Sequence, residues 1–214
     1  MRSGPEDMDS YSDLHLRDLL DAFAATAPAP GGGSAAAVTG ALGVSLLLMA
    51  VSIRMSKTGE SSHGSELTDA AGRLRSLRTE MTALVDRDAE AYAAVLAAVR
   101  MPRSDEEARM RRQEAHALAM RTATDVPLET MRGCCRALRD APLVASQAVR
   151  STHSDVGVAI ELLSAAVRAA GITIDANLDS SGDVEYGARV RGERRQLGSE
   201  SAADAEDASS RLSD

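Results

Sequence analysis

A single carboxylate stands out in this sequence because of its place in a repeating apolar pattern. Within residues 67–100 the pattern recurs every three or four positions, as on one face of a long helix, through Leu74, Leu77, Met81, Leu84, Asp88, Ala91, Val95 and Val99. Asp88 falls where leucine or alanine is expected. A core-facing carboxylate is unfavourable unless it is paired, hydrogen-bonded or protonated, and such surroundings tune a pKa for proton transfer. From spacing alone, a catalytic Asp88 and a structural ion pair with an arginine of another helix are equally good interpretations.

A glycine-rich segment is the second candidate. Gly31, Gly32, Gly33 and Ser34 follow Pro30 and open a long apolar stretch. Glycine lets the backbone approach a ligand closely, and the free N–H groups at a helix start attract anionic or carbonyl groups. The segment lacks the Gly-Lys-Ser/Thr ending of a P-loop, which argues against a nucleotide phosphate site. A tight turn that lets two helices pack closely is an equally weighted alternative.

The other side chains capable of chemistry form no pattern of their own. The four histidines lack metal-ligand spacing, so we predict no metal site. Cys134 and Cys135 are adjacent and cannot readily form a disulfide with each other, so we interpret them as buried side chains of a cytoplasmic protein. Asp155 could simply cap a helix, and Lys57 could be a solvated cation.

The composition favours helices as the elements that position these groups. Aromatic residues make up only 2% of the chain, and Ala, Leu, Arg and Glu dominate, so we predict an all-α fold rather than a β-sandwich or barrel. Hydrophobic residues at 44% suffice for a sizeable core. The formal net charge of −8 argues against a nucleic-acid partner.

The chain divides into a flexible N-terminus at 1–12, a helical domain at 13–195 and an acidic disordered tail at 196–214. Within the domain we predict helices over 14–25, 34–55, 67–100, 104–123, 128–138 and 143–150, one that begins near 151–155, and one over 179–195. Pro127 is expected to break or kink the chain. Gly171 either ends its helix or lies inside it.

One apolar segment invites a membrane interpretation. No charge lies between Ala22 and Ile53, and residues 35–53 are long enough to cross a bilayer. Many small and hydroxyl-bearing residues keep its hydrophobicity modest, and it lacks an aromatic belt. We therefore predict the central helix of a soluble bundle, with no membrane partner.

Four segments, in this order and spacing, resemble a known family. They are LRDLLDAFAATAPAPGGGSAAAVTGALGVSLLLMAVSI, LVDRDAEAYAAVLAAVRMPR, ATDVPLETMRGCCRAL and SDVGVAIELLSAAVRAAG, the last followed by NL. Over roughly residues 14–185 the chain resembles the cyclodeaminase/cyclohydrolase family, which includes the cyclodeaminase domain of formiminotransferase-cyclodeaminase and the bacterial methenyltetrahydrofolate cyclohydrolases. The resemblance implies an all-α homodimer of long antiparallel helices, a folate substrate, and no metal or redox cofactor.

The resemblance also implies roles for individual residues. The catalytic acid of the family matches Asp88, which makes Asp88 the expected general acid/base. Asp155 and Asn177 match polar positions that would lie on the pterin side or shape the site. Lys57 lies near a basic segment of the family and could meet the glutamate tail of folate. The segment 31–34 would be held against the substrate.

Two reactions fit this interpretation, and the sequence does not separate them. A cyclodeaminase converts 5-formimidoyltetrahydrofolate to 5,10-methenyltetrahydrofolate and ammonia, whereas a cyclohydrolase interconverts 5,10-methenyl- and 10-formyltetrahydrofolate. A relative that acts on a non-folate substrate is an alternative, since the segment after residue 53 contains few basic residues. A non-catalytic helical dimer is a further alternative, and Asp88 on the apolar seam argues against it.

Overall fold

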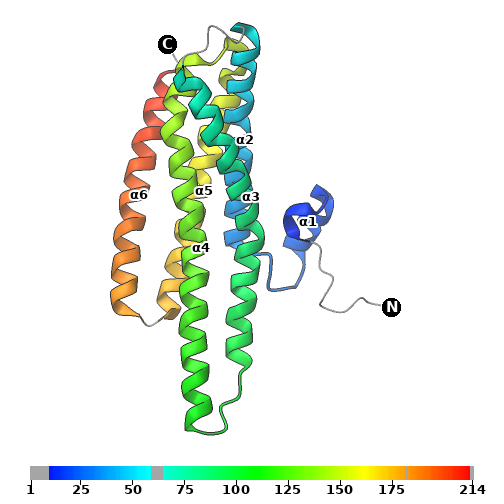
Figure 1. Ribbon diagram of the computed structural model, residues 1–214, viewed down its shortest axis with the longest axis vertical. Helices are drawn as coiled ribbons and strands as arrows, with labels where there is room; N and C mark the ends of the chain where they lie inside the picture. The colour runs from blue at the N-terminus through cyan, green and yellow to red at the C-terminus, as the bar shows by residue number, and fades with distance from the viewer. Residues whose placement is uncertain (1–9, 59–64, 182, 213–214) are drawn as a thin grey trace.

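A high content of helix-forming residues gives this chain long helices that alternate in direction (Figure 1). The computed structural model describes residues 10–58, 65–181 and 183–212. These residues form α1 (Leu16–Ala24), α2 (Gly32–Thr58), α3 (Ser65–Arg100), α4 (Glu106–Gln147), α5 (His153–Ser181) and α6 (Val184–Ser210), with short turns η1 (Tyr11–Asp13) and η3 (Arg150–Thr152). The predicted all-α bundle is confirmed. The homodimer stays a prediction.

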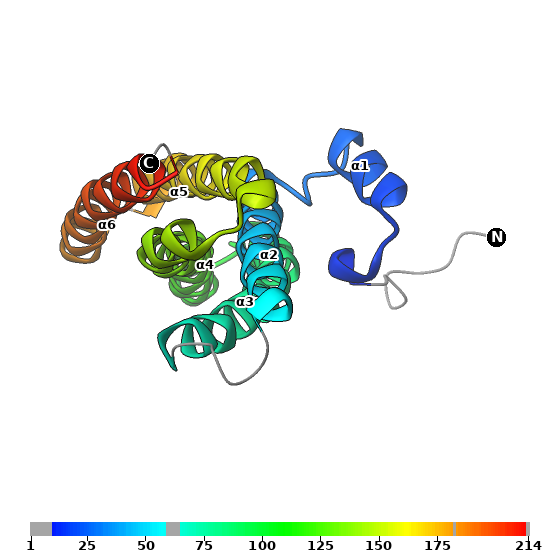
Figure 2. The same ribbon diagram turned by 90° about the horizontal axis from the view of Figure 1, so that it is seen from above.

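The core lies around α4, which packs against α2, α3, α5 and α6. Seen from above, these four helices form an arc around it (Figure 2). The apolar seam of α3 faces this core, since Leu74 and Met81 are fully buried and Leu84 is almost so. At the far end α3 and α4 extend beyond the other helices as a hairpin (Figure 1).

Two prolines lie inside α4, where the sequence analysis expected separate shorter helices. α4 runs unbroken through Pro127 and Pro142. A proline inside a helix is unfavourable by roughly 3 kcal/mol. The packing of α4 against four neighbouring helices offsets this cost. Local sequence rules do not include such packing, so they predicted a break at Pro127. Gly171 also lies inside its helix, and α5 continues to Ser181.

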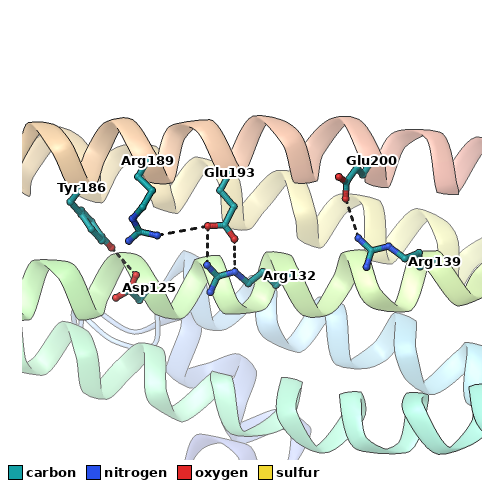
Figure 3. Close-up of polar contacts among 7 residues, drawn as sticks. All are labelled: Asp125, Arg132, Arg139, Tyr186, Arg189, Glu193 and Glu200. Carbon is teal, nitrogen blue, oxygen red and sulfur yellow. Dashed lines mark hydrogen bonds and ion pairs between the residues drawn. The ribbon is translucent and has the colours of Figure 1, made fainter.

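The prediction of a disordered tail from residue 196 is wrong for residues 196–210, which belong to α6. Ala208 is fully buried, Ser201 is 4% exposed and Ala205 packs against the core. These small residues recur at helical spacing and therefore form a face that packs closely, while Glu200 pairs with Arg139 of α4 (Figure 3). A composition typical of disorder thus forms a helix, because its small residues share one face.

Part of the predicted flexible N-terminus is held in place. Residues 1–9 lie outside the described residues. The Ser10 hydroxyl donates to Asp86 Oδ2 at 2.6 Å, and the Ser12 N–H donates to Asp86 Oδ1 at 3.3 Å. The Tyr11 hydroxyl donates to the carbonyl oxygen of Ala29 at 3.3 Å. Residues 10–12 are therefore fastened to α3 and to the loop before α2.

Two helices are long and apolar enough to span a membrane by length and composition alone, over 32–57 and 150–180. About half of the most apolar window of each, 50% and 44%, is buried inside the bundle. α2 packs against α3, α4 and α5, and α5 packs against α2, α4 and α6. Since core helices of a bundle pass the same test, this is weak support for a membrane span.

Candidate active site

A cavity of about 450 Å³ lies where the start of α2 meets α3, α4 and α5. The α3–α4 hairpin extends well below the start of α2 in Figure 1. Its volume is within the usual range for small-molecule sites. The cavity is lined by Pro28, Ala29, Gly31, Gly32, Gly33, Asp88, Ala89, Tyr92, Val95, His116, Met120, Ala123, Thr173, Asn177 and Ser180.

Asp88 is held through one of its two carboxyl oxygens. The Ser34 N–H donates to Asp88 Oδ2 at 2.7 Å, and the Ser34 hydroxyl lies 2.9 Å from the same oxygen. The hydroxyl is also 3.0 Å from the carbonyl oxygen of Val85. Asp88 Oδ1 has no hydrogen bond within the described ranges, where every buried side-chain polar atom has a partner. Oδ1 is therefore accessible, and it is the oxygen available to a molecule in the cavity.

The surroundings of Asp88 make its carboxyl group a weaker acid than a solvated one. Burial raises the pKa of Asp88 above its ordinary value, and the side-chain and backbone hydrogen bonds from Ser34 oppose that rise. The described residues give Asp88 no ion pair, so the structural arginine pair considered from the sequence is not what holds it. A carboxyl group with a raised pKa and one free oxygen can accept a proton and return it.

The three glycines do different things. A Cβ on Gly33 would lie 2.6 Å from Asp88 Cγ, which no side chain tolerates, so Gly33 is what lets α2 approach the carboxyl group. A Cβ on Gly32 would make an ordinary contact of 3.6 Å with Thr173, and one on Gly31 would meet nothing within 4 Å. Ser34 is fully buried and lies outside the lining, so its contact is with Asp88 rather than with a bound molecule.

The other predicted site residues separate into two groups. Asn177 lines the cavity, and its Nδ2 donates to the carbonyl oxygen of Ala123 at 2.6 Å. Lys57 and Asp155 lie at the opposite ends of α2 and α5. At 1.5 Å per residue, Lys57 is roughly 36 Å along α2 from Gly33, and Asp155 is roughly 27 Å along α5 from Thr173. The structure therefore does not bring Lys57 or Asp155 into the cavity of the same chain.

Four polar lining residues were not identified as site residues from the sequence: Tyr92, His116, Thr173 and Ser180. Tyr92 follows Asp88 by one helical turn, and the spacing of the seam was sufficient to find it. His116 and Thr173 lie on α4 and α5, and only the register between those helices places them opposite Asp88. No local pattern signals that register.

A second cavity, of about 470 Å³, lies between α3, α4 and α6, and its arginines already have partners. Arg132 binds Glu193 at 2.6 Å, and the neighbouring Arg139 binds Glu200 at 3.0 Å (Figure 3). The same side of the bundle contains the pairs Arg87–Glu129 and Arg136–Glu80. These pairs join neighbouring helices, so the cavity is a structural groove. The cavity that contains Asp88 is the candidate active site.

Comparison with known proteins gives consistent matches. A profile of the formiminotransferase-cyclodeaminase family matches residues 15–196. The chain is 33% identical over 162 residues to the methenyltetrahydrofolate cyclohydrolase of Methylorubrum extorquens, across 76% of this chain and 78% of that one. It is 32% identical over 192 residues to the formimidoyltransferase-cyclodeaminase of Rattus norvegicus, covering 88% of this chain and 35% of the rat protein.

The fold has a solved counterpart. The crystal structure of a formiminotetrahydrofolate cyclodeaminase from Thermotoga maritima matches with a TM-score of 0.84, over 94% of this chain and 96% of that one, at 21% sequence identity. The family profile covers most of the chain, and the cyclohydrolase relative is similar over three quarters of it. The resemblance inferred from the motifs is confirmed, and the chain belongs to the formiminotransferase-cyclodeaminase family.

Proposed function

We propose that the protein is a methenyltetrahydrofolate cyclohydrolase in which Asp88 is the general acid/base. The observation that carries this proposal is the free Oδ1 of a carboxyl group with a raised pKa at the wall of a ligand-sized cavity. The similarity to the cyclohydrolase of Methylorubrum extorquens, which extends over most of both chains, supports this reaction.

The reaction needs two proton movements that one carboxyl group can perform. Water adds to the methenyl carbon between N5 and N10, and Asp88 Oδ1 takes a proton from it as the new C–O bond forms. Asp88 then returns that proton to N5 as the C–N5 bond breaks. The remaining hydroxyl proton leaves to solvent as the formyl carbonyl forms on N10. Proton transfer of this kind is worth roughly a hundred- to ten-thousand-fold in rate.

Formimidoyltetrahydrofolate cyclodeaminase activity is the second candidate, because the rat formimidoyltransferase-cyclodeaminase is similar over 192 residues. Here N10 would attack the formimidoyl carbon, and Asp88 would take the N10 proton. Asp88 would then give a proton to the amino group, which leaves as ammonia and yields the methenyl product. Both candidates use the same oxygen of the same residue.

An assay with two substrates separates these candidates. Decay of the methenyl absorbance faster than in buffer identifies a cyclohydrolase, and its growth from 5-formimidoyltetrahydrofolate identifies a cyclodeaminase. Asp88→Asn is expected to lower kcat by roughly a hundred-fold or more, while Glu90→Gln, an exposed carboxylate on the same helix, leaves kcat unchanged. No turnover of either folate by the wild-type protein would disprove the proposal.

A non-folate substrate remains a separate candidate because the lining contains neither arginine nor lysine. The glutamate tail of a folate would then have no cation within the described cavity of one chain. Turnover of a tail-less methenyltetrahydropterin with the same kcat/KM as the folate would show that the tail is not recognised. A large preference for the folate would instead require a cation from outside this cavity.

The proposal includes a homodimer in the cytoplasm. α1 supports the dimer, since it buries none of its residues and exposes Leu16 and Leu20 at 71% and 58%. An amphipathic helix with an uncovered apolar face is suited to contact with a second copy. Sedimentation of the purified chain tests it, and a monomer at micromolar concentration would contradict it.

A further inference from the structure

The buried Pro127 leaves one carbonyl oxygen of α4 free to accept a hydrogen bond from a neighbouring helix. In an α-helix the carbonyl oxygen of Ala123 would accept from the N–H of residue 127, and proline has no N–H. Asn177 of α5 takes that place, and its Nδ2 donates to the Ala123 oxygen at 2.6 Å. Asn177 is therefore bonded to the carbonyl oxygen of Ala123, which Pro127 leaves without its usual helical donor.

This bond fixes which end of the Asn177 amide faces the cavity. A carbonyl oxygen can only accept, so the NH₂ group must point at Ala123 and Oδ1 must point away from it. Within the described residues Oδ1 has no hydrogen-bond partner, and no buried side-chain oxygen there is left without one. Oδ1 is therefore accessible, and Asn177 lines the candidate cavity. The cavity wall offers a hydrogen-bond acceptor of fixed orientation.

We propose that Asn177 is a specificity-determining residue whose Oδ1 accepts from an N–H group of the substrate, and that Pro127 positions it by freeing the carbonyl oxygen of Ala123. The substrate class rests on the proposed function, because a reduced pterin carries amide and amino N–H groups on its ring edge. A site with an oriented acceptor discriminates strongly against a ring that presents an acceptor there, since two acceptors would face each other unpaired.

Substitution of Pro127 tests the coupling without touching the cavity. In Pro127→Ala the restored N–H competes for the Ala123 oxygen, so Asn177 loses its anchor and both amide orientations become available. We expect KM to rise about three- to ten-fold, as for loss of one hydrogen bond, with kcat within about two-fold of wild type. Pro142→Ala makes the same change fifteen residues further along α4 and should leave both constants unchanged. Asn177→Leu should raise KM at least as much as Pro127→Ala.

Asn177 is the only asparagine in the chain, which gives a readout independent of activity. Protein labelled with ¹⁵N only at asparagine side chains shows a single NH₂ pair. We expect that pair to shift and exchange faster with solvent in Pro127→Ala, and to stay unchanged in Pro142→Ala. An unchanged pair in Pro127→Ala would overturn the positioning role.

The outcomes separate this inference from the proposed function. If the wild-type protein turns over neither folate, the proposed function is wrong. The signals of the NH₂ pair then still test whether Pro127 positions Asn177. If the wild-type protein is active but folded Asn177→Leu keeps its KM, only the specificity role is overturned. If Asn177→Leu does not fold, Pro127→Ala decides in its place, because alanine favours the helix and should not destabilise it.

Discussion

Gly33→Ala tests the close approach of α2 to the carboxyl group of Asp88. The added Cβ would clash most severely with Asp88 Oδ1, and it would lie 2.6 Å from Cγ and 2.8 Å from Oδ2, where ordinary contact needs at least 3.4 Å. The carboxyl carbon would therefore have to move by about 0.8 Å, and Oδ1 by more. Since α2 is packed against three helices, we expect the side chain of Asp88 to rotate away rather than the helix to move.

The consequence for catalysis follows from that displacement. Rotation of Asp88 breaks its bonds to the N–H and hydroxyl of Ser34 and moves Oδ1 from its place at the cavity wall. A misplacement near 1 Å costs roughly a hundred-fold in rate, so kcat should fall by about that factor. The free energy of unfolding should fall by about 0–2 kcal/mol, because crowding of about 1–3 kcal/mol is partly offset by the gain of about 1 kcal/mol from alanine in a helix.

The assay is the methenyl absorbance, with Gly31→Ala and Gly32→Ala as matched controls. Both controls add the same methyl group beside the cavity, yet neither reaches Asp88, so each should keep kcat within about three-fold of wild type. Thermal unfolding of all three variants checks that they are folded. If Gly33→Ala retained the wild-type kcat, the geometry of the glycine segment would not be what holds the catalytic carboxyl group.

Three further predictions concern the rest of the fold. Burial raises the pKa of Cys134 to about 12 and that of Cys135 to about 11, so neither thiol should react with an aromatic disulfide reagent at pH 8 until guanidinium unfolds the chain. Rapid labelling of the native protein would contradict this. A chain ending at residue 196 should lose at least about 2 kcal/mol of unfolding free energy in guanidinium titrations, since it lacks the buried face around Ala208. An unchanged midpoint would support the original prediction that this segment is disordered. Asp140→Asn should lose about 1 kcal/mol in the same titration, because Asp140 accepts from Arg73 through both oxygens and its side chain is only 12% exposed. Glu80→Gln, which weakens the more exposed pair with Arg136, is the control expected near zero.

The sequence was sufficient to locate Asp88 because a polar residue on an apolar seam interrupts a strong local pattern. The sequence could not identify the partner of Asp88, since either an ion pair with arginine or a hydrogen bond from serine can stabilise a buried carboxylate. Ser34 becomes that partner only because Gly33 lets the two helices approach closely, and this is a fact about the space between elements.

The two wrong predictions, a break at Pro127 and a disordered tail after residue 196, have a common physical cause. Rules for Pro127 and for the small, acidic residues after 196 describe an isolated chain, in which both oppose helix formation. In the bundle, α4 gains its stability from four neighbouring helices and α6 from a face of small side chains against α4 and α5. Tertiary burial outweighs local preference in both places.

The two carboxylates of the Val85–Asp88 segment connect three separate parts of this chain. Asp86 accepts from Ser10 and Ser12, and the neighbouring Tyr11 holds the carbonyl of Ala29 on the cavity wall. Asp88, two residues on, faces the start of α2. One turn of α3 therefore holds the start of α2 directly, through Asp88, and holds Ala29 indirectly, through the segment that carries Tyr11. A substitution at either aspartate should therefore alter the same cavity wall, Asp88 through Ser34 and Asp86 through the segment that holds Ala29.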